Sequence, residues 1–350
     1  MASIDKMIDS DISNKIANMS FVCALLVVLI HCPKVMSEGG VAFMHNCFPG
    51  AFMSMANAFF FTVSGFFLAA HFAEKGWWEK ELAKRVHSLI VPYFLLNALW
   101  FFVQVIYQWP NVRYPVDAST FHWVGVLRAF GLYGSTNPVN GPLWYLRTLI
   151  LFVVTAPLVV APFTRKKAVG YCACLLLFLL NCFDAWKLVL PEAVFWVYRP
   201  QWLAFFLWGA TMRIHGIPQT RKCLSLSSLI MGFLLSLHAP QEVLDTQSIP
   251  FYNAARWLSR PLLIIGVFSI VGSHKWPKIL VGNSFAIYVL HWPLIIAAYI
   301  ICGKTNTFHA IFGSVFNSIA YFLTVIGLTI AVAQAIRRNH LLSRLLLGGR

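Results

Sequence analysis

Charged side chains are scarce in this sequence, and their scarcity excludes most classes of protein. Of its 350 residues, 11% are charged and 59% are hydrophobic, and the mean hydropathy is +0.70. Soluble domains carry about 25% charged and 45–50% apolar residues. The high apolar content excludes a disordered chain. The 8 cysteines are too sparse for a secreted disulfide scaffold, so a polytopic membrane protein remains.

Two further features are missing. The apolar runs do not alternate with polar residues, which argues against a β-barrel, and the first run lacks the cleavage site of a signal peptide. At about 20 residues per span, we expect an all-α integral membrane protein with about ten transmembrane helices. They form one domain over 1–350, between a short N-terminal segment, 1–16, and a basic tail, 337–350, resting on anionic lipid. The expected spans are 17–35, 50–73, 86–107, 142–163, 168–189, 195–214, 224–239 (short and weak), 255–272, 280–302 and 311–336.

Acidic residues are also few, and the net charge is +15. If the N-terminus is cytoplasmic, the inner segments hold 18 of the 27 Lys and Arg residues, whereas the 12 acidic residues divide equally between the two groups of segments. A bias confined to Lys and Arg is typical of the positive-inside rule. The sequence therefore predicts that both termini are cytoplasmic, and nucleic acid is not needed to explain the charge.

The longest expected outer segment is 108–141. It contains the stretch GSTNPVNGP, which cannot be helical throughout because of its Pro, Asn and Gly residues. We expect a short interfacial helix at 120–132. Loops of this length are often lids or binding elements, although a plain connector is an equal alternative.

Ionisable groups inside a span are costly, so each is a candidate functional residue. His31 lies roughly 20 Å from the inner end of the first span, at about 1.5 Å per residue, and His291 lies near the middle of the ninth. A histidine packed against a neighbouring helix is the alternative for each. No cluster of Cys or carboxylate residues accompanies them, so we expect no metal site. Two histidines at similar depth therefore favour proton chemistry.

Other polar residues in the spans have two interpretations each. Arg147 lies near the outer end of the fourth span, where it either snorkels outward or faces a cavity for a hydroxyl-rich or anionic acceptor. We expect Arg199 and Arg260 to be interfacial anchors. Asn57 and Ser64 are typical of hydrogen bonds between membrane helices, and they are also candidates for lining a cavity.

A basic cluster precedes the third span. Lys80, Lys84, Arg85 and His87 lie within the expected inner segment EKGWWEKELAKRVHSLIVPYF. The positive-inside rule alone accounts for their charge. Alternatively, they bind a phosphate-bearing ligand at a helix N-terminus, where side-chain charge and the helix dipole act together.

Six phrases, in order along nearly the whole chain, resemble the membrane acyltransferase type 3 family, bacterial enzymes that acylate sugars. The branch is similar to single-domain O-acetyltransferases. The phrases are the apolar first helix ending in His31, FTVSGFFL (61–68), KRVHSLIVPY (84–93), GPLWYLRTLIL (141–151), RPQWLAFFLWGA (199–210) and GNSFAIYVLHWPLI (282–295).

The resemblance implies an enzyme of the bacterial inner membrane. It implies a cytoplasmic acyl-CoA as donor substrate, with no bound cofactor, and the hydroxyl of a cell-envelope glycan or glycolipid as acceptor. Acetyl-CoA is the expected donor and succinyl-CoA the alternative. His31 is then the catalytic base or a covalent acyl relay. The donor-binding residues are Arg85, Lys84, His87 and Ser88, and the residues lining the acceptor side or cavity are Asn57, Ser64, Trp144, Arg147, Tyr288 and His291.

Two positions depart from the family pattern, and two other functions stay open. Ser20 and Ser88 stand where many members carry arginine. A polytopic transporter of a lipid-linked sugar or small anion is the alternative class, although such proteins favour broken helices and repeats, which are not evident here. A catalytically inactive relative that binds glycolipid is the third hypothesis. Oligomeric state is not readable from the sequence.

Overall fold

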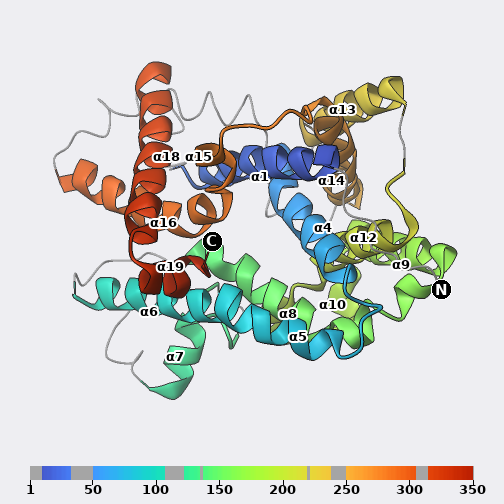
Figure 1. The fold of residues 1–350 in the computed structure, drawn as a ribbon, viewed down its shortest axis with the longest axis horizontal. Helices are drawn as coiled ribbons and strands as arrows, with labels where there is room; N and C mark the ends of the chain where they lie inside the picture. The colour runs from blue at the N-terminus through green and yellow to red at the C-terminus, as the bar shows by residue number, and fades with distance from the viewer. Residues whose placement is uncertain are drawn as a thin grey trace.

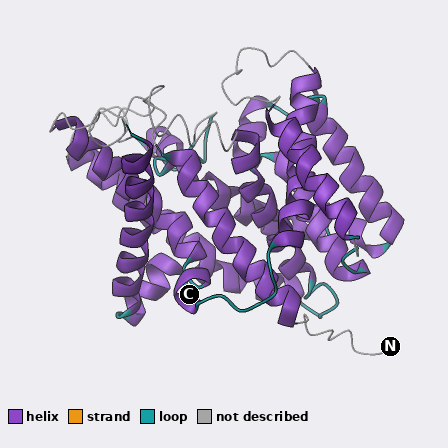
Figure 2. Ribbon diagram, turned by 90° about the horizontal axis from the view of Figure 1, so that it is seen from above, coloured by secondary structure: helices purple, strands orange, loops and turns teal. Residues whose placement is uncertain are grey.

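The computed structural model describes residues 10–32, 50–106, 122–134, 137–218, 221–237, 250–304 and 314–349. These residues form helices joined by short connections, without a β-strand in any of the seven segments (Figures 1 and 2). The all-α class is therefore confirmed for the part of the chain that the structure describes.

An α-helix occurs within each of the ten expected spans. These helices are α1 (Ser10–His31), α4 (Met55–Ala69), α6 (Val91–Ile106), α8 (Trp144–Val159), α9 (Lys167–Cys182), α12 (Leu203–His215), α13 (Lys222–Leu237), α14 (Pro250–Ile270), α16 (Ser284–Lys304) and α18 (Val315–Arg337). Among the described residues, four helical stretches are long and apolar enough to cross a membrane, namely Ser10–His31, Trp77–Val105, Gly141–Val159 and Val315–Arg337. Ten crossings and cytoplasmic termini stay predictions.

Shorter helices connect or flank these elements. They are α3 (Gly50–Met53), α5 (Trp77–Arg85), η1 (Val86–Ile90), α7 (Trp123–Ala129), η3 (Gly141–Leu143), η4 (Phe163–Arg165), α10 (Trp186–Val189), α11 (Glu192–Tyr198), η5 (Pro200–Trp202), α15 (Lys278–Val281) and α19 (His340–Leu347). The helix α7 lies within 120–132, where the sequence predicts a short helix. Of the expected outer segment 108–141, residues 108–121, 135 and 136 lie outside the described residues.

A π-helical turn interrupts the third long helix. The elements α5, η1 and α6 follow one another without a break, and η1 is the π-helical stretch. Pro92 is the second residue after it, and a proline inside a helix lacks an N–H donor and clashes with the carbonyl four residues earlier. A wider π turn at this point relieves that crowding, and such turns are frequent at functional sites.

The helices α4 and α12 approach each other closely because each carries a glycine at the crossing. A Cβ atom on Gly65 would lie 1.9 Å from the carbonyl oxygen of Phe206, and one on Gly209 would lie 1.8 Å from that of Thr62. Glycine is therefore required at both positions by backbone contact, as in the small-residue interfaces of membrane helices.

The substitution Gly209→Ala is expected to destabilise the protein by about 1–3 kcal/mol or more, because a methyl group cannot fit against a backbone carbonyl without separating the two helices. The melting temperature of the detergent-solubilised protein measures this effect. Gly327→Ala on α18 is the matched control, since a Cβ atom there meets nothing within 4 Å. Equal melting temperatures for both variants would contradict the close crossing.

Arg260 is not an interfacial anchor, and that prediction is wrong. Its side chain is buried, because α14 packs against α3, α4, α9 and α13. Its guanidinium carbon lies 4.0 Å from the Trp257 ring centroid and 5.1 Å from that of Trp202, and Nε donates to Oγ of Ser54 at 3.0 Å. Cation–π contacts contribute about 2 kcal/mol when desolvated, whereas burying an ion costs several kcal/mol, so these contacts alone do not offset its burial.

The basic tail also differs from its description as a segment lying on lipid. Residues 340–347 form α19, which packs against α6 (Figure 1). Leu347 is fully buried, and Nη2 of Arg344 lies 3.3 Å from Nε2 of His87, to which it donates. The helix ends at Gly348, whose positive φ of 66° suits glycine. The C-terminal part of α19, with Leu346 and Leu347, therefore packs on protein, whereas Leu341 and Leu342 are exposed.

Candidate functional site

A cavity of about 330 Å³ lies between α1, α4, the α5–η1 junction, α8 and α16. Its lining is apolar except for a few side chains that can form hydrogen bonds, which is typical of ligand sites. The lining residues are Ser20, Phe60, Val63, Ser64, Phe67, Arg85, Leu89, Tyr145, Leu146, Leu149, Ser284, Phe285 and Tyr288. The five helical segments are far apart in the sequence, so the cavity exists only in the folded chain.

Two tyrosines form the polar centre of the cavity. The hydroxyl groups of Tyr145 and Ser64 are hydrogen-bonded at 3.2 Å, and the rings of Tyr145 and Tyr288 pack edge to face with centroids 5.3 Å apart. The hydroxyl of Tyr288 donates to the carbonyl of Pro142. This bond fixes the ring of Tyr288 between the cavity and the start of α8.

The two buried histidines of the sequence prediction meet at the junction of α1 and α16. The ring centroids of His31 and His291 are 5.3 Å apart, and the Trp292 ring packs edge to face on His31, also at 5.3 Å. Tyr288 connects this pair to the cavity, since its ring centroid lies 6.4 Å from that of His291. The structure therefore places both histidines one helical turn beyond the cavity along α16.

The hydrogen bond of His291 determines its tautomer. Its Nδ1 lies 2.9 Å from the carbonyl oxygen of Ile287, and a carbonyl only accepts, so Nδ1 carries the proton. The other nitrogen, Nε2, is buried without a hydrogen-bond partner among the described residues. The ring is fully buried, and the His31 ring lies beside it.

His31 and Ser20 lie on one face of α1. They are eleven residues apart, which is three turns of an α-helix and a rise of roughly 16 Å. Ser20 lines the cavity, and its hydroxyl donates to the carbonyl of Ile16 at 2.7 Å. The same helix face therefore leads from the cavity to the partly exposed ring of His31.

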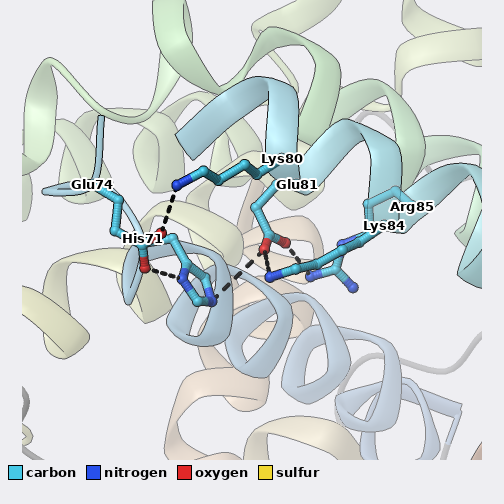
Figure 3. Close-up of polar contacts among 6 residues, drawn as sticks. All are labelled: His71, Glu74, Lys80, Glu81, Lys84 and Arg85. Carbon is cyan, nitrogen blue, oxygen red and sulfur yellow. Dashed lines mark hydrogen bonds and ion pairs between the residues drawn. The ribbon is translucent and has the colours of Figure 1, made fainter. Parts of the chain in front are cut away.

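The basic cluster is organised by one buried carboxylate, Glu81 (Figure 3). Its Oε1 accepts from Nζ of Lys84 at 2.7 Å, and its Oε2 accepts from Nη2 of Arg85 at 3.1 Å. His71 approaches the same carboxylate, with Nε2 3.7 Å from Oε1. The Glu81 side chain is 3% exposed and that of Arg85 23%. Glu81 therefore holds Arg85 where its guanidinium lines the cavity.

The outer part of the cluster is more exposed. Nδ1 of His71 lies 2.6 Å from Oε1 of Glu74, and Nζ of Lys80 lies 3.8 Å from Oε2 of the same residue. The hydrogen bond from His71 holds the pKa of Glu74 below its usual value, although the side chain is exposed. Glu74 and Glu81 therefore neutralise part of the basic charge (Figure 3).

The four predicted donor residues separate into two pairs. Arg85 lines the cavity, and Lys84 shares its carboxylate while its own side chain is 61% exposed. His87 and Ser88 instead meet the C-terminal segment, where a Cβ atom on Gly348 would lie 2.8 Å from Cα of Ser88. The described cavity lining does not include His87 or Ser88.

Arg147 binds backbone rather than facing the cavity. Its side chain is 2% exposed. Nη1 donates to the carbonyl of Gly131, and Nη2 donates to that of Trp196 at 2.8 Å. Arg147 therefore ties the segment after α7 and the helix α11 to the start of α8. Trp144, beside it, stacks under the guanidinium of Arg199, whose carbon lies 4.6 Å from the ring centroid.

Asn57 lies outside the described cavity lining but on the same face of α4. It precedes Phe60 and Ser64 by three and seven residues, the spacing of one helix face, and its side chain is half-buried. Its position extends the polar face of α4 toward the N-terminus of that helix.

Sequence reasoning missed Tyr145 and Glu81. Tyr145 belongs to the phrase at 141–151, but nothing in the phrase distinguishes it from its neighbours. Glu81 had a readable signal, since it lies three residues before Lys84 and four before Arg85, the spacing at which opposite charges pair on a helix.

Comparison with known proteins gives the family of the chain. The family model described as "Acyltransferase domain" (Acyl_transf_3) matches residues 16–338. The chain therefore belongs to this acyltransferase family. It is also similar to the succinoglycan biosynthesis protein ExoH of Rhizobium meliloti (strain 1021), at 23% identity over 81% of this chain and 74% of that protein. No solved structure matches.

Replacing Glu81 by glutamine is expected to destabilise the protein by about 1–3 kcal/mol, because charged groups lose a buried hydrogen-bonding partner. The melting temperature of the purified protein is the measurement. Glu79→Gln, an exposed position on the same helix α5 without an ion pair among the described residues, is the matched control. A melting temperature unchanged by Glu81→Gln would show that the cluster does not depend on this carboxylate.

Proposed function

We propose that this protein transfers an acyl group, acetyl in the first instance, from cytoplasmic acyl-CoA to a hydroxyl of a cell-envelope glycan or glycolipid. The observation that carries the proposal is the cavity whose lining comes from the first helix and from four of the phrases shared with the family. At one end of this cavity lies Arg85, and beyond its other end lie His31 and His291.

The donor enters at the basic end. Lys84 and Arg85 supply positive charge for the CoA phosphates. Because Glu81 neutralises part of that charge, the cluster favours a multiply charged anion over a small one. The acyl arm then occupies the cavity between Ser20 and Tyr288. The rise of roughly 16 Å along α1 is the distance that the thioester has to cover to reach His31.

His31 acts as the base. It takes the proton of the acceptor hydroxyl while the hydroxyl oxygen attacks the thioester carbonyl carbon. This attack forms the C–O bond of the ester. Collapse of the tetrahedral intermediate then breaks the C–S bond, and the protonated His31 returns its proton to the departing CoA thiolate. Nε2 of His291 can accept a hydrogen bond from a neighbouring hydroxyl of the acceptor sugar, which would orient the acceptor. A covalent acyl-histidine on His31 is the alternative route.

A polysaccharide acceptor is supported by the name of the similar protein, which refers to succinoglycan biosynthesis. Succinyl-CoA is the alternative donor. The multi-pass placement in a bacterial inner membrane, with both termini inside, belongs to the proposal, because it puts Arg85 on the CoA side and His31 toward the acceptor.

Membranes containing the protein are expected to transfer label from acetyl-CoA, or from succinyl-CoA, to envelope glycan, and His31→Ala should lower this transfer at least 100-fold, since general bases contribute about 10²–10⁴-fold. Scintillation counting of the glycan fraction is the measurement. His122→Ala, an exposed histidine next to α7, is the control. Full activity of His31→Ala removes His31 as the base, and solute movement without thioester cleavage would favour a transporter.

Arg85→Ala is expected to raise the apparent KM for acyl-CoA about 10-fold or more with little change in the KM for the acceptor, because a charge-assisted contact to phosphate is lost. Initial rates at varied donor and acceptor concentrations separate the two constants. Arg344→Ala tests the neighbouring surface, since Arg344 contacts His87 and lies outside the described cavity lining. An unchanged donor KM in Arg85→Ala would move the donor site elsewhere.

A further inference from the structure

We propose that Arg256 and Arg260 on α14 form an anion-binding subsite that receives a carboxylate or phosphate group of the acceptor. The proposal rests on the function proposed above and adds the chemical class of its acceptor. The subsite is distinct from the donor end of the cavity, where Arg85 lies.

Arg260 carries a buried charge that has no counter-ion among the described residues. It is 2% exposed, Nε donates to Ser54, and Nη1 is buried without a hydrogen-bond partner in that part of the chain. The ion pairs of acidic side chains in the described ranges involve neither Arg260 nor Arg256. Buried charges in proteins are normally paired, so a bound anion is the partner that we infer for this one.

A second buried hydrogen-bond donor lies beside Arg260. The indole Nε1 of Trp202 is buried and has no acceptor within the described ranges, and the Trp202 ring lies 5.1 Å from the guanidinium of Arg260. The rings of Trp202 and Trp257 attract the cation but offer no oxygen to either N–H. Two unpaired donors and one positive charge together require a ligand that brings several acceptor atoms and negative charge, which is the chemistry of an oxyanion.

We expect the anion to reach Arg260 past the side chain of Arg256. It lies one turn before Arg260 on the same face of α14, and its side chain is half-buried. From the other side, Trp202 packs on Phe61 with centroids 5.6 Å apart, and Phe61 packs on Tyr145 at 4.5 Å. One aromatic side chain therefore separates the subsite from the reaction cavity, so an anion held here positions the rest of a glycan near the cavity.

The test uses the purified full-length protein in detergent and needs no acyl transfer. Melting temperatures are recorded with glucuronate, inorganic phosphate or glucose at matched ionic strength. We expect a saturable rise with glucuronate or phosphate and none with glucose, since a ligand of the folded state raises its stability. A response to glucuronate alone assigns an acidic sugar, and a response to phosphate alone assigns a lipid-linked phosphate.

Arg260→Gln and Arg256→Gln should each weaken that binding at least 10-fold. Arg256→Gln keeps the test valid if Arg260→Gln fails to fold, because the Arg256 side chain is only half-buried. Arg128→Gln on α7 is the matched control and should bind like the wild type. No saturable response to either anion would overturn the subsite. So would a response that Arg85→Ala abolishes and Arg256→Gln retains, which would place the anion at the donor end.

Discussion

The packing of α1 against α16 determines where chemistry can take place in this protein. α1 carries Ser20 and His31 on one face, and α16 carries Tyr288 and His291. Because the two helices contact each other along these faces, cavity-lining residues meet at one level and the imidazoles at the next. A change in the register of one helix by a single turn would separate the histidines, since each turn displaces a side chain by about 5.4 Å.

Two buried charged side chains, Glu81 and Arg260, differ in whether an oppositely charged side chain of the described residues pairs with them. Near α5, Glu81 is buried and two basic side chains satisfy both of its oxygens, so the carboxylate is fully paired. On α14, Arg260 is buried and no carboxylate among the described residues pairs with it. Burial of an unpaired ion costs several kcal/mol, and ring faces offset only part of this. This unpaired charge is the reason for the anion-binding subsite that we propose on α14.

Much of the candidate site was predictable from local pattern. Hydropathy located the helices, and the exceptions within them, His31 and His291, were visible because ionisable residues are rare in such runs. The pairing of Glu81 with Arg85 also follows from helical spacing. The roles of Arg147 and Arg260 did not follow, because a residue near the end of a span reads as a snorkelling side chain until its neighbours are known. Both proved to be buried, the first on backbone carbonyls and the second on indole rings.

The sequence by itself determined that the chain is an all-helical membrane protein, because composition and apolar run length leave no other way to satisfy the backbone in lipid. It also determined the family, through phrases that keep their order. Tertiary structure alone decided which residues share a cavity and that the C-terminal segment contacts His87 and Ser88. The physical reason is that helix rotation and depth are set by long-range packing, such as the backbone contacts of Gly65 and Gly209, and local pattern carries no information about partners so distant in the chain.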